Sequence, residues 1–126
     1  MNFFESIKSC FIRYTDFSGR SIRSEYWNFL LFLIIIDFIL DYIDALIAGV
    51  PWLDYEEWYG PLGIIWLLLT IVPGLAVGIR RLHDINKSGW WILLSITIIG
   101  LIPLVYWACL KGDEGDNRFG SNPLKN

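Results

Sequence analysis

Three long apolar segments constrain the fold of this chain more than any other feature of its sequence. They cover residues 26–48, 62–79 and 90–110. A helix rises about 1.5 Å per residue, so segments of this length match the roughly 30 Å hydrocarbon core of a bilayer. A hydrophobic content of 55% is also too high for an ordinary soluble domain of 126 residues. The sequence therefore predicts an all-α membrane protein with three transmembrane helices, in a single integral membrane domain over residues 1–126.

The two ends of the chain differ from these apolar segments. Residues 2–15 place aromatic and aliphatic side chains at helical spacing, with polar residues mostly on the other face. This pattern predicts an N-terminal interfacial amphipathic helix, although the same stripe could equally pack on the protein's own helices. Residues 111–126 are rich in glycine and charge, which predicts a polar tail in water or against lipid headgroups.

The distribution of basic residues predicts the orientation of the chain. Lysine and arginine lie before the first apolar segment and between the second and the third, whereas residues 49–60 are acidic and aromatic and contain neither. Basic residues are retained on the cytoplasmic side, so the pattern predicts a multi-pass membrane protein with a cytoplasmic N-terminus. Three spans would place the C-terminus outside the cytoplasm. If the third segment turned back between Gly100 and Pro103 as a re-entrant pair, the tail would be cytoplasmic instead.

Local signals refine the predicted helices. Pro73 followed by Gly74 predicts a kink in the second helix, which a membrane helix tolerates when a neighbour satisfies the freed carbonyl. Ser21 or Ser24 is expected to cap the first one. Residues 80–91 change from basic to polar to doubly aromatic, and indole rings favour the membrane boundary. This segment therefore predicts a hairpin at the membrane surface.

Three motifs occur in order around the apolar segments: GRSIRSEYW at 19–27, RRLHD at 80–84 followed by SGWW at 88–91, and NRFGSNP at 117–123. Together they resemble the bacterial inner-membrane family known as domain of unknown function 805, the YhaH-like proteins. The resemblance covers nearly the whole chain and implies a small integral membrane protein, without an established reaction, cofactor or substrate. One local variation is Asn86, at a position where relatives often have glycine.

The motifs place most of the charged and indole residues of interest on the predicted cytoplasmic face. Guanidinium groups form forked hydrogen bonds to phosphate, so this face is a candidate site for anions, lipid headgroups or a partner protein. Alternatively, the arginines set the topology and pair with the two acidic residues there. The candidate residues are Arg20, Arg23, Glu25, Arg80, Arg81, His83, Asp84, Lys87, Trp90 and Trp91.

An acidic stripe runs along the first apolar segment. Asp37, Asp41 and Asp44 are spaced by four and then three residues, which places them on one face of a helix. A carboxylate near the bilayer midplane costs about 2.5 to 3.5 kcal/mol on insertion scales and should face a polar partner or be protonated. The stripe indicates either a proton or cation path, or an aqueous vestibule or oligomer contact.

His83 beside Asp84 suggests an imidazole base oriented by a carboxylate, but the sequence lacks the other parts of known catalytic sites. It has no Gly-x-Ser-x-Gly elbow and no phosphate-binding glycine loop. The single histidine, the two distant cysteines and the calcium-like but incomplete pattern at 112–118 predict no metal site. We therefore expect no catalytic residue, no metal and no cofactor.

The sequence thus predicts a non-enzymatic component of the inner membrane that binds lipid or a protein partner. The alternative is a small transporter or channel subunit that uses the aspartate stripe. Membrane lipids and either a second copy or another membrane protein are the expected partners. The net charge of −3 and the dispersed basic residues argue against nucleic acid.

Overall fold

The computed structural model describes residues 1–55 and 60–125, so residues 56–59 of the predicted outer loop lie outside the described residues. The described part is helical and contains no strand, which confirms the all-α fold class. The elements are α1 (Phe3–Ile12), α2 (Arg23–Ala48), the 3-10 helix η1 (Trp52–Asp54), α3 (Pro61–Asp84), the 3-10 helix η2 (Gly89–Ile96), α4 (Ile98–Cys109) and the 3-10 turn η3 (Pro123–Lys125).

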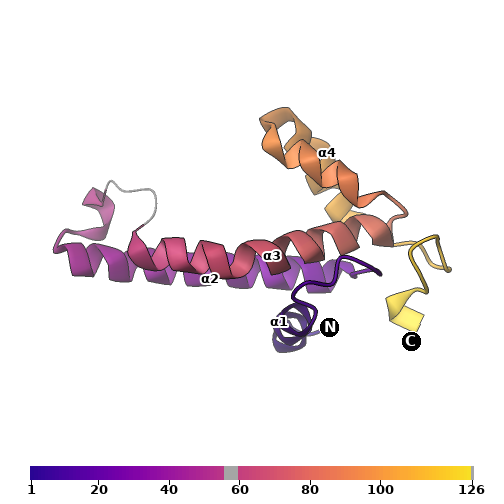
Figure 1. Ribbon diagram of the computed structural model, residues 1–126, viewed down its shortest axis with the longest axis horizontal. Helices are drawn as coiled ribbons and strands as arrows, with labels where there is room; N and C mark the ends of the chain where they lie inside the picture. The colour runs from indigo at the N-terminus through magenta and orange to yellow at the C-terminus, as the bar shows by residue number, and fades with distance from the viewer. Residues whose placement is uncertain (56–59, 126) are drawn as a thin grey trace.

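The two longest helices, α2 and α3, lie side by side as an antiparallel hairpin (Figure 1). They contain 26 and 24 residues, which corresponds to lengths of about 39 and 36 Å. Among the described helices, α3 is the one that is long and apolar enough to cross a membrane. α2 ends at Gly49, whose positive φ of 74° favours glycine and stops the helix.

Helix α3 continues through Pro73, as the sequence predicts. Proline has no N–H, so the carbonyl of Leu69, four residues earlier, loses its partner within the helix. The hydroxyl of Tyr14 donates to that carbonyl. The helix also extends beyond the predicted end at residue 79, because Arg80 and Arg81 find partners that allow them to be buried in its last turns.

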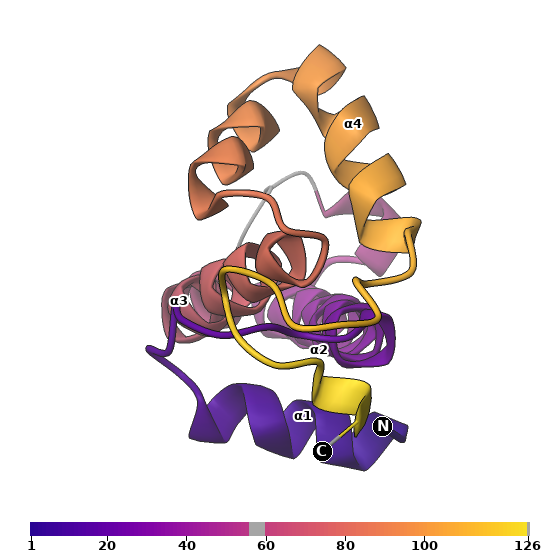
Figure 2. The ribbon, with the colours of Figure 1, turned by 90° about the vertical axis from the view of Figure 1, so that its right-hand side faces the viewer.

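The third apolar segment, over residues 90–110, does not form the predicted single helix. It is divided into η2 and α4, and Thr97 between them has an extended backbone and accepts a hydrogen bond from the N–H of Gly100 at 3.0 Å. A Cβ at residue 100 would lie 2.2 Å from the Leu94 carbonyl oxygen, so glycine permits this close reversal. Figure 2 shows η2 and α4 as two arms of a wedge that open toward the hairpin. A reversal therefore exists, but several residues earlier than the alternative over Gly100 to Pro103 placed it.

Helix α1 lies crosswise to the hairpin and packs on α2 (Figures 1 and 2). It begins with a capping box in which Asn2 and Glu5 bond each other's backbone N–H groups. The apolar stripe is divided between two roles: Phe11 packs edge-on against buried Phe29, whereas Phe4 is 78% exposed. Part of the stripe therefore packs on the protein's own helices, and the interfacial location of the exposed part stays a prediction.

The C-terminal tail contacts the rest of the protein through several hydrogen bonds, while many of its residues are exposed, and its place in water or against headgroups stays a prediction. It wraps the end of the hairpin where α2 begins and α3 ends (Figure 2). The N–H of Asp113 donates to the Asp84 carbonyl at 2.9 Å, and the Asn117 side chain donates to the His83 carbonyl at 2.9 Å. The composition of the tail does not predict this packing, because the tail takes part in it mainly through backbone carbonyls that accept hydrogen bonds.

Candidate functional site

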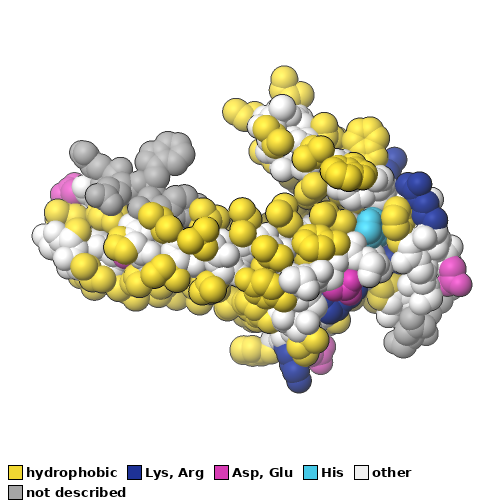
Figure 3. Space-filling model, in the orientation of Figure 1, with side chains coloured by type: hydrophobic (Ala, Val, Ile, Leu, Met, Phe, Trp, Pro, Cys, Tyr) yellow, Lys and Arg dark blue, Asp and Glu magenta, His cyan; other side chains and the backbone are white. Residues whose placement is uncertain are grey.

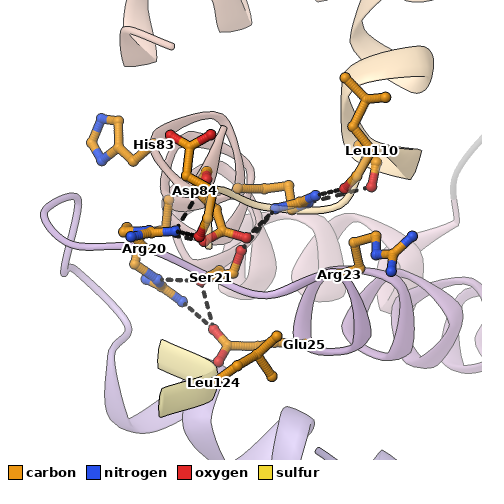
Figure 4. A network of polar contacts seen from close by, with 12 residues as sticks. Arg20, Ser21, Arg23, Glu25, His83, Asp84, Leu110 and Leu124 are labelled. Carbon is orange, nitrogen blue, oxygen red and sulfur yellow. Dashed lines mark hydrogen bonds and ion pairs between the residues drawn. The ribbon is translucent and has the colours of Figure 1, made fainter. Parts of the chain in front are cut away.

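Five charged side chains from distant parts of the chain meet at the closed end of the fold, and we call them the arginine network. Each is at most 3% exposed, although charged groups are rarely buried without partners. Figure 4 shows Arg20 from the segment before α2, Glu25 from the start of α2 and Asp84 from the end of α3 converging on one region. The members are Arg20, Glu25, Arg80, Arg81 and Asp84.

One half of the network centres on Arg80. Its Nη2 donates to the Glu25 carboxylate at 3.1 Å and its Nε donates to the Ser21 hydroxyl at 2.8 Å. The Ser21 hydroxyl in turn donates to Glu25 at 2.8 Å. The backbone carbonyls of Arg13 and Asp16 accept from Nη1. This half joins the N-terminal segment to both long helices.

The other half centres on Asp84, which receives two guanidinium groups. Arg20 Nε donates to Oδ1 at 2.9 Å and Arg81 Nη1 donates to Oδ2 at 2.5 Å. The remaining N–H groups of these arginines donate mainly to carbonyls that no short motif predicts. Those carbonyls belong to Ser21, Asp84, Ala108, Leu110, Asp113, Gly115 and Gly120.

The tail closes the network at Gly112. A Cβ at this position would lie 2.0 Å from Oδ2 of Asp84, so the chain can pass here only without a side chain. No buried side-chain nitrogen or oxygen within residues 1–55 and 60–125 lacks a hydrogen-bond partner. Three guanidinium groups face two carboxylates, and carbonyls at the C-terminal ends of α3 and α4 carry partial negative charge that offsets the excess.

The arrangement differs from the expected binding face. Arg20, Arg80 and Arg81 point into the protein and are engaged by carboxylates and carbonyls. The pairing with Glu25 and Asp84 follows the alternative considered from the sequence. Chemically, the network is a sealed structural junction that holds the hairpin, the wedge and the tail together.

Several other candidate residues lie outside the network. Arg23 is exposed and its Nη1 donates to the Cys109 carbonyl at 3.2 Å, and Figure 4 shows it pointing away from the buried charges. The Lys87 ammonium lies 5.2 Å from the centre of the Trp107 ring. Trp91 packs edge-on against the same ring, while Trp90 is 79% exposed. Two basic residues therefore contact the C-terminal half of α4 without being buried.

His83 and Asp84 do not form an acid–base pair. The Asp84 carboxylate is turned to Arg20 and Arg81, whereas His83 Nδ1 lies 2.9 Å from the Gly19 carbonyl. The imidazole stacks on Phe119 with a centroid separation of 3.9 Å and an interplanar angle of 3°. Adjacent positions on a helix point in different directions, which sequence proximity alone concealed.

The aspartate stripe serves separate local purposes. Asp44 is 2% exposed and accepts hydrogen bonds from the N–H groups of Leu62 and Gly63, both at 3.2 Å, so it satisfies the N-terminus of α3. Asp41 accepts from the Trp52 indole N–H at 2.6 Å. Asp37 makes no hydrogen bond within the described residues and lines a shallow hollow beside Thr70. The three carboxylates therefore do not form one hydrogen-bonded path.

The structure shows the N-cap of α2 and the backbone of the turn after α3. The prediction that Ser21 or Ser24 caps the first long helix is wrong, because Ile22 is the N-cap and makes no side-chain cap bond. Ser21 lies in the arginine network instead, and sequence reasoning missed that role. Asn86 has a positive φ of 61°, a backbone conformation that asparagine and glycine adopt more readily than other residues.

The two cysteines have contrasting environments. Cys10 is fully buried in α1 against Glu25, and burial together with that carboxylate raises the pKa of its thiol to about 12. Cys109 is exposed at the end of α4. The Cys10 thiol is therefore protonated and shielded at neutral pH, whereas Cys109 is open to reagents.

Comparisons with known proteins agree with the resemblance seen in the motifs. The family model for "Protein of unknown function (DUF805)" matches residues 14–121, which include the whole arginine network. Over 111 residues the chain is 42% identical to inner membrane protein YhaI of Escherichia coli (strain K12), covering 87% of both chains. It is 40% identical over 111 residues to inner membrane protein YhaH of the same strain, covering 87% of this chain and 88% of that protein. No solved structure matches.

Proposed function

The chain belongs to the DUF805 family of bacterial inner-membrane proteins, and from that premise we propose that it is a non-enzymatic membrane component that binds lipid at the wedge formed by η2 and α4. The observation that carries this proposal is an apolar cavity between the wedge and α3, whose one charged lining residue is Arg81 of the network, while Lys87 contacts the lining residue Trp107. The cavity has a volume of about 120 Å³. Its apolar wall includes Gly78, Ile92, Leu101, Leu104 and Val105.

The wedge is a re-entrant element in this proposal. Both of its ends meet the arginine network, because Gly89 follows the last turn of α3 and the carbonyls of Ala108 and Leu110 accept from Arg81. Its tip is strongly apolar, with Ile98 86% exposed. Figure 3 shows apolar side chains over the hairpin and the wedge, and basic ones gathered at the end that carries the histidine. Two spans and a re-entrant wedge place both termini in the cytoplasm.

Labelling of Cys109 tests this topology. In a Cys10→Ser background, a membrane-impermeant maleimide is expected to label Cys109 in inside-out vesicles and not in intact spheroplasts. Lys111→Cys in a cysteine-free background is a second reporter, because the side chain at residue 111 is 63% exposed and lies two positions further on. Labelling of both positions from the outer face would contradict the wedge and favour a third complete span.

The bound lipid in this proposal is anionic. A short segment of one acyl chain occupies the cavity, and the phosphate approaches Lys87 beside Trp107 and Arg23 beside Cys109. Basic groups between membrane helices favour anionic headgroups, and the amphipathic indole of Trp107 lies between the two environments. The sealed arginine network supplies the rigid frame for this site.

Native mass spectrometry of the purified protein with phosphatidylglycerol tests the site. Val105→Trp fills the cavity from an exposed position and should abolish retention of the lipid, because the indole occupies the acyl-chain volume. Ile99→Trp is the matched control on the same helix, since Ile99 is exposed and does not line the cavity. Lys87→Gln and Arg23→Gln should each weaken retention by roughly two- to fivefold. Equal retention by the two tryptophan variants would refute the proposal.

The geometry gives less support to the other functions considered from the sequence. An enzyme that uses His83 and Asp84 lacks the contact between imidazole and carboxylate that orients a base. A conducting path along the stripe is interrupted, because Asp44 caps α3 and Asp41 bonds Trp52. Asp37 is the group that a second copy or another membrane protein would cover.

A further inference from the structure

A second cavity lies between η2 and the tail, apart from the cavity beside α4. Its volume is about 330 Å³, and its wall is largely apolar, with Phe17, Ile79, Leu93 and Phe119 among the lining residues. Trp90 and Leu93 are exposed at its border. His83, the single histidine of the chain, is among the residues that line this cavity.

The imidazole presents a hydrogen-bond acceptor to this cavity. His83 is 7% exposed, and its Nδ1 donates to the Gly19 carbonyl, because a carbonyl oxygen can only accept. Among residues 1–55 and 60–125 no carboxylate bonds to the ring, and the Arg118 guanidinium lies 4.8 Å from the centre of the Phe119 ring on which the imidazole stacks. These surroundings favour the neutral imidazole, in which Nε2 carries a free lone pair.

Nε2 is open to the cavity. It has no hydrogen-bond partner in the described part of the chain, yet no fully buried side-chain nitrogen or oxygen there is unsatisfied, so this atom is reached from the cavity. A Cβ at residue 89 would lie 3.4 Å from Nε2 and 2.6 Å from Cγ2 of Ile79. Glycine at this position therefore leaves the space beside the nitrogen free.

We propose that this cavity binds an amphipathic membrane lipid with a hydroxyl group, whose apolar body lies along η2 and whose hydroxyl donates to Nε2 of His83. A bound ligand covers the Nε2 lone pair and removes its solvation. A ligand with a hydrogen-bond donor replaces the lost interaction, whereas a ligand without a donor does not, so the cavity selects strongly for a donor. The chemistry is shared by phenolic lipids and by lipids with a glycerol headgroup. An equally apolar ligand that carries only an acceptor is excluded.

The single histidine of the chain provides a direct readout. Protein labelled with nitrogen-15 at histidine and reconstituted in nanodiscs is titrated with a long-chain alkylphenol, with its methyl ether, and with phosphatidylglycerol in separate arms. The phenol should shift the Nε2 resonance, leave Nδ1 nearly unchanged, and bind about three- to tenfold more tightly than the ether. A shift with phosphatidylglycerol but not with the phenol would identify the glycerol headgroup as the source of the hydroxyl.

Two variants distinguish recognition by His83 from a structural effect. His83→Phe should remove the preference for the phenol over the ether. Leu93→Trp fills the cavity without altering the imidazole and should abolish the shift, whereas Ile96→Trp, on the same 3-10 helix but outside the cavity, should preserve it. Val105→Trp should also preserve it, so failure of the lipid site beside α4 is separable from failure here. Equal binding of phenol and ether together with no shift by phosphatidylglycerol, or an unchanged shift in Leu93→Trp, would overturn the inference.

Discussion

Replacing Asp84 with asparagine is expected to lower the free energy of unfolding by about 3 to 5 kcal/mol, which is the range for removing one partner of a buried ion pair. The carboxylate is 3% exposed and binds both Arg20 and Arg81. Asparagine has nearly the same size, so little packing is lost. The substitution leaves two guanidinium groups without their anion and directs an N–H donor toward another donor.

Reversible unfolding in mixed detergent micelles, followed by tryptophan fluorescence, measures this loss. The matched control is Glu114→Gln, which removes the acidic partner of the exposed pair between Lys111 and Glu114. Screening by water limits that pair to about 1 kcal/mol or less. If Asp84→Asn cost no more than Glu114→Gln, water would have to reach the network, and the sealed junction described here would be wrong.

Replacing Phe29 with alanine is expected to lower the free energy of unfolding by a similar amount, about 3 to 5 kcal/mol. The substitution leaves a cavity where α1 crosses the hairpin. Phe29 is fully buried, packs with Cys10 and Val77, and makes an edge contact with Phe11 at 5.6 Å between ring centroids. Loss of this ring should loosen α1 from α2. The Cys10 thiol would then reach water, and its pKa would fall from about 12 toward the ordinary value.

The alkylation rate of Cys10 at pH 8, in a Cys109→Ser background, reports this loosening, and unfolding in mixed micelles reports the stability. Phe38→Ala is the control on the same helix, since Phe38 is 57% exposed and lipid can replace its contacts. We expect a change within about 1 kcal/mol and no gain in Cys10 reactivity for this control. Rapid alkylation of Cys10 before any substitution would show that α1 does not pack as described.

Periodicity and helix-boundary signals anticipated much of the local structure. The apolar segments over 26–48 and 62–79 correspond to α2 and α3, and the break at Pro73 is accommodated as expected. The N-terminal stripe forms α1. These features depend on the spacing of side chains along one helix, which is visible in the order of residues.

Other parts depended on contacts between segments far apart in the sequence. A continuous apolar segment does not reveal that residues 90–110 reverse at Thr97, because that reversal depends on local hydrogen bonds and on the close approach at Gly100. The contact between the tail and Arg20 was not anticipated, because the tail binds this arginine through its backbone carbonyls rather than through its charges. Backbone acceptors are the same in every residue type and leave no compositional signal.

The amino-acid sequence alone was sufficient to predict a helical, membrane-type chain of the DUF805 family and the residue types of its three motifs, because hydrophobic periodicity and motif order are local properties. The sequence could not show whether the arginines of these motifs are exposed on a basic face or buried against acidic and carbonyl partners. That distinction depends on whether Glu25, Asp84 and the tail carbonyls reach the arginines, and only the tertiary structure brings them within hydrogen-bond distance. The same folding separates His83 from Asp84 and turns its imidazole to a cavity, because side-chain direction on a helix end is decided by the neighbours packed against it.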